Sequence, residues 1–129
     1  LEDARQWLIE RICNYQAMKQ NNVILVFDAY RVKGAVREVE KVHGISVVYT
    51  KEAETADAYI EKTTKQLAKH YRVRVATSDA LEQMIIFGHG ARRIPAGEFY
   101  EEVKQTEQEL RQFLKDHNEE YKLSISEIL

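Results

Sequence analysis

Apolar residues alternate along this chain between helix-like spacing and short continuous runs typical of buried strands. Residues 1–18 carry one apolar face at spacings of three and four, which predicts an amphipathic helix that stops near Asn21. That face consists of Ala4, Leu8, Ile12 and Tyr15. Residues 23–28 form an unbroken apolar run ending in an acid, which predicts a strand buried on both faces, at the centre of a sheet.

The remaining segments continue this alternation. Strands are predicted at 45–50 and 72–77, a short extended piece at 91–94 before Pro95, and helices at about 57–69, 79–87 and 97–116. Residues 31–41 are basic, weakly patterned and interrupted by Gly34, so they are predicted to be a loop or a short frayed helix. Residues 117–129 are predicted to be a docked tail or a truncated last helix.

This order of elements predicts an α/β fold. Short connections between alternating helices and strands favour a mostly parallel central sheet with helices on both faces. Residues 1–129 show no internal repeat or linker, so a single domain is expected.

Composition narrows the functional classes. The chain has 129 residues, 44% of them hydrophobic and 31% charged, which is enough for one modest core. Its formal net charge of −2 gives no overall basic field, so binding to nucleic acid would need a local basic patch. The single cysteine, Cys13, excludes an internal disulfide framework. With no apolar run of spanning length and no signal segment, a cytoplasmic location without membrane association is expected.

Acidic residues follow the predicted strands. Asp28 and Asp79 end two of these strands, and Asp57, with Glu54 nearby, follows a third. Strand ends of a parallel sheet meet at one edge, where sites are commonly built, so these carboxylates are expected to converge. Oxygen ligands without histidine or thiolate suit Mg²⁺ or Mn²⁺, which assist phosphodiester hydrolysis.

Each acid also has a purely structural interpretation. Asp79 stands where a helix N-cap belongs, and Asp79-Ala-Leu-Glu82 has the spacing of a capping box. Asp57 in a first helical turn would interact favourably with the helix dipole. Asp28 could begin an Asx-turn. Only convergence of the three acids distinguishes a site from these local roles.

Other side chains offer weaker signals. Lys33, Arg92 and Arg93 could contact a phosphate backbone, or could belong to an ordinary charged rim. Three tyrosines could stack on bases, or could simply pack against the core or its rim: Tyr30, Tyr49 and Tyr71.

Several motifs, in order, resemble those of the YacP-like NYN-domain family, part of the PIN-like nuclease superfamily. They are Glu2-Asp-Ala-Arg5, Val26-Phe-Asp-Ala29 with Val32-Lys-Gly34, Tyr49-Thr-Lys-Glu52 with Glu54-Thr-Ala-Asp57, Val75-Ala-Thr-Ser-Asp79, and Ile86-Phe-Gly88 through Gly90-Ala91. The resemblance runs from about residue 2 to residue 103.

The resemblance implies a PIN-like three-layer α/β/α sandwich and a metal-dependent endoribonuclease acting on single-stranded RNA. It further implies a link to ribosome-associated mRNA decay. It assigns metal binding to Asp57 and Asp79, with Asp28 and Glu54 in matching motifs. Lys33 and Arg93 fall at matching basic positions, where RNA contact is a hypothesis.

One departure from the family pattern affects the expected activity. Family members open with a hydrophobic strand ending in Asp-Gly-Tyr-Asn, which supplies a first metal-binding acid, and this sequence begins after it. The last helix is also expected to be cut short. We therefore expect weak or no activity from this polypeptide alone, and self-association through exposed sheet edges.

Two other functions fit the sequence. One is a non-catalytic RNA- or ribosome-binding module with an incomplete metal site. The other is a receiver-like phosphate-transfer domain, but no phosphoacceptor with a partner lysine could be assigned for it.

Overall fold

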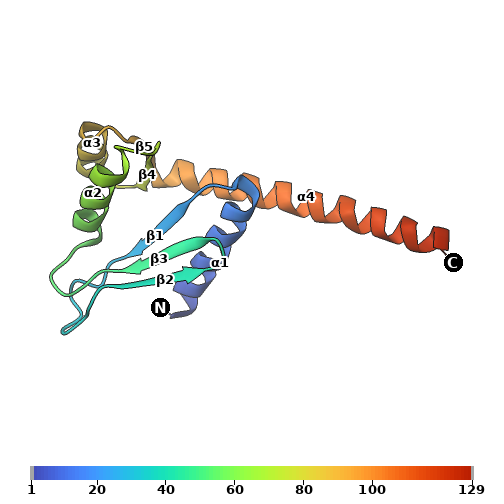
Figure 1. The fold of residues 1–129 in the computed structure, drawn as a ribbon, viewed down its shortest axis with the longest axis horizontal. Coiled ribbons are helices and arrows are strands. Elements are labelled where there is room, and N and C mark those ends of the chain that lie inside the picture. Colours follow the sequence, from blue (N-terminus) through green and yellow to red (C-terminus); the bar gives the residue numbers. More distant parts are fainter. Residues whose placement is uncertain (1, 129) are drawn as a thin grey trace.

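The computed structural model describes the backbone of residues 2–128 and the side chains of residues 2–118, and it contains four helices and five strands in that range. In chain order these are α1 (Glu2–Lys19), β1 (Val23–Phe27), β2 (Glu38–Val42), β3 (Ile45–Tyr49), α2 (Ala56–Leu67), β4 (Arg74–Thr77), α3 (Ala80–Gly88), β5 (Arg92–Pro95) and α4 (Ala96–Ile128). Figure 1 shows their arrangement.

The first sheet has three strands in the order β1-β3-β2. β1 runs parallel to β3, with Val23 opposite Ile45, and β2 runs antiparallel to β3. The β2–β3 turn is tight because His43 adopts a left-handed φ of 52° before Gly44. This sheet is mixed, with β3 at its centre.

The second sheet consists of β4 and β5, which pair in parallel. The intervening helix α3 starts at the N-cap Asp79, and just beyond its C-cap Gly90 takes a φ of +82° that favours glycine. Both ends of α3 are therefore explained by local sequence signals, an N-cap aspartate and a glycine after the C-cap.

Each sheet has its own apolar cluster. The larger cluster joins α1, β3 and α4 through Ile9, Ile12, Tyr15, Ile45, Val47 and Val103. The smaller one gathers Val75, Ile86 and Ala91 around α3, β4 and β5. Two modest cores thus replace the single one expected.

A polar contact links the two halves. Arg74 of β4 donates hydrogen bonds from both terminal nitrogens to Glu102 of α4, at 2.6 and 2.8 Å, and from Nη2 to the Tyr15 hydroxyl of α1, at 3.0 Å. The Tyr15 hydroxyl also donates to Glu102 at 3.2 Å, and its ring packs edge-on against Phe99. The second sheet is thereby attached to the helices that cover the first.

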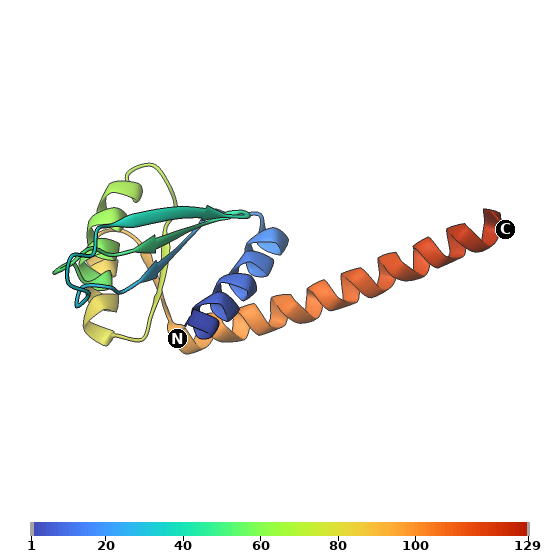
Figure 2. The same cartoon turned by 90° about the horizontal axis from the view of Figure 1, so that it is seen from below.

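Helix α4 starts directly after β5, crosses α1 and then extends well beyond the body of the molecule (Figures 1 and 2). On its projecting part, Phe113 and Leu114 are about half exposed. Within residues 2–128, none of the helices combines the length and apolar character needed to cross a membrane.

The predicted single, mostly parallel sheet is divided into two, one of them mixed, and four further corrections concern individual elements. The predicted loop at 31–41 ends in a strand, β2, whose exposed Glu38, Val39 and Glu40 gave no buried pattern. β1 lies at an edge of its sheet, with Ile24 43% exposed, because β3 takes the central place.

The third and fourth corrections concern α1 and α4. The buried face of α1 is formed by Ile9, Ile12 and Tyr15, while the predicted Ala4 is exposed. Helix α4 continues to Ile128 instead of ending near Asp116, so the segment predicted as a docked tail or a truncated last helix prolongs α4. Leu129 lies outside the described residues.

Replacing Ile86 tests the second core. Ile86 is fully buried, so Ile86→Ala should lower the free energy of unfolding by about 2–5 kcal/mol, through lost apolar contacts and a residual cavity. Met84→Ala, on the exposed face of the same helix, should change it by less than about 0.5 kcal/mol. Urea denaturation measures both, and equal effects would contradict this packing.

Candidate metal and active site

Asp79 lies between the end of β4 and the start of α3. Its Oδ1 accepts hydrogen bonds from the backbone N–H groups of Leu81, at 2.9 Å, and Glu82, at 3.3 Å. The N-cap interpretation is therefore confirmed. Both bonds use the same oxygen, so the cap and a metal ligand are compatible roles for one carboxylate.

The capping box itself is only half formed. In a complete box the Glu82 carboxylate would accept a hydrogen bond from the Asp79 N–H. That N–H instead donates to the Thr77 hydroxyl oxygen at 3.2 Å. The Glu82 side chain is thus released from the cap and packs inside the protein.

Asp57 occupies the first turn of α2, but it does not cap that helix. Thr55 is the N-cap, and its hydroxyl oxygen accepts a hydrogen bond from the Ala58 N–H at 3.1 Å. Although Asp57 is exposed, partial desolvation of its carboxylate raises its pKa, and the carboxylates of Asp79, Glu61 and Asp28 raise the pKa further. A favourable interaction of Asp57 with the helix dipole would not explain why three other carboxylates act on its pKa.

Asp28 follows β1 and forms the predicted Asx-turn, because its Oδ1 accepts a hydrogen bond from the Tyr30 N–H at 3.1 Å. The same carboxylate contributes to the raised pKa of Asp57. The three acids predicted from strand ends are therefore near enough to interact electrostatically.

Two further acids belong to this group, and the sequence analysis missed both. Glu82 is only 3% exposed, and its Oε1 is buried without a hydrogen-bond partner. Burial raises the pKa of Glu82 to about 7, with smaller contributions from Glu61, Asp57 and Asp79. A buried carboxylate oxygen without a partner is costly unless a proton or a cation satisfies it.

A sequence signal for these two acids does exist. Glu61 lies four residues after Asp57 on α2, so two like charges share one helix face, which destabilises a helix. Glu82 lies three residues after Asp79, so the capping-box spacing offered a structural role for its carboxylate, and a functional role was not considered. Acids that violate a local preference in this way are typical of functional positions.

The group's chemistry suits a hard cation. It offers only carboxylate oxygens, which Mg²⁺ and Mn²⁺ prefer, and the buried Oε1 of Glu82 has no hydrogen-bond partner among the described residues. Among the side chains of residues 2–118, no three acids, histidines or cysteines lie close enough to form a ready-made ligand set. Mg²⁺ commonly keeps several waters and is held by one or two carboxylates, so it does not require a ready-made set of three protein ligands.

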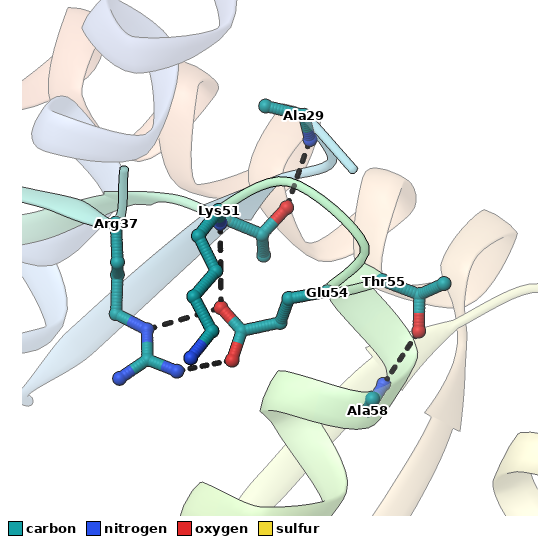
Figure 3. A network of polar contacts seen from close by, with 7 residues as sticks. Ala29, Arg37, Lys51, Glu54, Thr55 and Ala58 are labelled. Carbon is teal, nitrogen blue, oxygen red and sulfur yellow. Dashed lines mark hydrogen bonds and ion pairs between the residues drawn. The ribbon is translucent and has the colours of Figure 1, made fainter. Parts of the chain in front are cut away.

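Glu54, also predicted as a metal ligand, is placed differently. Its carboxylate forms an ion pair with Arg37, through Nε at 3.0 Å and through Nη2, and also accepts a hydrogen bond from the Lys51 N–H (Figure 3). This pairing lowers the pKa of Glu54. The carboxylates that act on Asp57 are those of Asp79, Glu61 and Asp28, whereas Glu54 pairs with Arg37.

The predicted basic residues lie on two segments. Lys33 is exposed on the loop after β1, the loop that begins with Asp28. Arg92 and Arg93 are exposed on β5, and the Arg93 guanidinium lies over the Phe87 ring, 5.3 Å from its centroid. They remain predicted RNA contacts.

Comparisons with known proteins agree with the motifs. A family model described as the YacP-like NYN domain matches residues 1–129. Over 110 residues the chain is 44% identical to YacP of Bacillus subtilis, covering 84% of this chain and 64% of that protein. The chain thus spans somewhat less than two thirds of that relative.

Solved structures show the same relationship. A crystal structure of Rae1 (YacP) from Bacillus subtilis matches with a TM-score of 0.77 and 40% identity, covering 97% of this chain and 74% of that one. A mutant of the same protein matches with a TM-score of 0.75 and 39% identity, covering 89% and 67%. These matches confirm the predicted α/β fold.

The pKa of Glu82 predicts how stability depends on pH when no metal is present. In the folded chain, Glu82 faces Glu61, Asp57 and Asp79 and binds its proton more tightly than in the unfolded chain. Its contribution to stability is therefore complete below about pH 4.5 and lost as the pH rises through about 7.

Glu82→Gln should remove much of this dependence. In EDTA, the free energy of unfolding of the unmodified chain should fall between about pH 5 and about pH 8 by on the order of 2 kcal/mol more than that of Glu82→Gln. Glu109→Gln, an exposed change on α4, should behave as the unmodified chain. Parallel curves for all three would contradict a buried, protonated Glu82.

Proposed function

Because this chain belongs to the YacP-like NYN domain family, we propose that it is a metal-dependent endoribonuclease domain that hydrolyses phosphodiester bonds of single-stranded RNA. The observation that carries this proposal is the gathering of acids at the ends of β1 and β4 and the start of α2. Its clearest sign is the buried, unpartnered Oε1 of Glu82. A structural protein has no evident use for so much like charge in one place.

The acids have distinct roles in this proposal. Asp57 and Asp79 hold Mg²⁺ or Mn²⁺, and Asp28 supports them from the end of β1. The bound ion supplies the positive charge that polarises a phosphoryl oxygen and acidifies water. The neighbouring carboxylates help to raise the pKa of Asp57, and a bound cation would offset that effect, so metal and carboxylate would stabilise each other.

RNA is the proposed partner. Lys33, Arg92 and Arg93 would contact its phosphates, which gives positioning without sequence preference. We further propose mRNA as the substrate, association with the ribosome, and a cytoplasmic location.

Cleavage of a fluorescent single-stranded RNA, with Mn²⁺ or with EDTA, tests this function. Cleavage should need Mn²⁺ and should fall by about 100-fold or more in Asp57→Asn and Asp79→Asn, since even groups that only orient metal ligands typically cost 10- to 100-fold. The assay uses this chain and a longer version beginning with the family's opening strand, whose activity should be the greater.

Two substitutions separate metal binding from structure. Asparagine caps helices as well as aspartate does, so Asp79→Asn should keep its stability while losing cleavage, whereas Asp79→Ala should lose about 1 kcal/mol as well. Glu54→Gln breaks the Arg37 pair but should leave cleavage close to that of the unmodified chain.

Unchanged cleavage in Asp57→Asn and Asp79→Asn would contradict the proposal. If no version cleaves RNA, and if RNA affinity depends on Arg92 and Arg93 but not on metal, the non-catalytic binding module is correct instead.

A further inference from the structure

A hollow of about 330 Å³ adjoins the acid group. Residues Asp28, Ala29, Tyr30, Arg31 and Val32 line it, directly after β1. Its volume is at the lower end of the range for small-molecule pockets. Because Asp28, which the proposed function places at the metal site, lines the hollow, a ligand in the hollow would lie beside that site.

Two side chains give the hollow its chemistry. The Arg31 guanidinium lies over the Tyr30 ring, 5.2 Å from its centroid, and its Nε donates a hydrogen bond to the Tyr30 hydroxyl. A flat aromatic ring and a flat guanidinium are the surfaces on which proteins stack the bases of single-stranded RNA. The exposed Lys33 adds positive charge nearby, which complements a phosphate backbone.

The backbone that carries Tyr30 is held in place from both sides. The Ala29 N–H donates to the hydroxyl oxygen of the fully buried Thr50 at 2.8 Å. The Tyr30 N–H donates to Asp28, and the Tyr30 carbonyl accepts from the Ala53 N–H at 2.9 Å. The hollow is therefore preorganised, which lowers the entropic cost of binding.

We propose that this hollow is a nucleobase subsite, in which one base of single-stranded RNA stacks against Tyr30 and Arg31 next to the scissile phosphate. This inference rests on the proposed function and adds to it a place for one base. Stacking accepts any base, so the subsite positions the strand without selecting a sequence.

Binding in EDTA tests the subsite without cleavage. Fluorescence anisotropy measures the affinity of this chain for a labelled oligouridine and for matched oligomers with one abasic nucleotide at successive positions. Tyr30→Ala should bind the intact RNA at least about fivefold more weakly, the lower limit expected for one stacked base. Tyr30→Phe keeps the ring but loses the hydroxyl that accepts from Arg31, so it should retain most of the affinity that Tyr30→Ala loses.

The abasic series identifies the contact itself. At one position, the abasic nucleotide should weaken binding by the unmodified chain about as much as Tyr30→Ala weakens binding of the intact RNA. The same abasic RNA should bind Tyr30→Ala as tightly as the intact RNA does, because both changes remove the same contact. Tyr71→Ala, which removes a tyrosine 60% exposed and outside the hollow, should show neither effect.

The subsite would be refuted if Tyr30→Ala binds intact RNA normally, or if every abasic position weakens both proteins equally. Failure of the subsite is distinguishable from failure of the proposed nuclease. The nuclease is judged by metal-dependent cleavage in the Asp57 and Asp79 variants, whereas the subsite is judged by metal-free affinity.

Discussion

The contact of Arg74 with Glu102 and Tyr15 attaches β4 to the helices that cover the other sheet. In the described part of the chain, β1 and β4 belong to separate sheets, so no shared ladder aligns their ends. Yet the candidate site needs that alignment, because Asp28 follows β1 and Asp79 follows β4. This three-residue contact, together with the packing of α4 on β4 and β5, therefore supports the geometry on which the chemistry depends.

The same geometry creates an electrostatic conflict. Asp28, Asp57, Glu61, Asp79 and Glu82 come from three segments, and desolvation together with their mutual repulsion raises the pKa values of Asp57 and Glu82. Local roles hold two of the acids firmly, since Asp79 caps α3 and Asp28 closes a turn. Fold stability alone would favour a neutral residue at position 82. The proposed divalent cation would explain why acids occupy these places.

The sequence predicted the helices and most strands well, because caps and turn residues are local signals. Thr55, Asp79 and Gly90 define element ends at or near the expected places. It failed for β2, since an exposed edge strand has no buried face to produce a pattern. The division into two sheets was also missed, because strand pairing depends on packing between distant segments.

Within the site, the acids at strand ends were identified because position and residue type agreed. Glu61 and Glu82 were missed because each lies inside a helix, where a charged residue is ordinarily a solvated one. Glu54 was included because it stands in the same motif as Asp57, but its pairing with Arg37 depends on a loop distant in sequence. Which acids act on one another depends on tertiary structure, so local sequence patterns could not predict it.

The central claim is that these acids share one cation, and paramagnetic NMR tests it most directly. Substoichiometric Mn²⁺ is added to the ¹⁵N-labelled chain and the loss of each backbone amide signal is followed. The account predicts selective loss around residues 28–30, 57–61 and 79–82, reversed by Mg²⁺ and absent in Asp57→Asn. Signal loss spread evenly over the exposed acids of α4, or unchanged in Asp57→Asn, would contradict it.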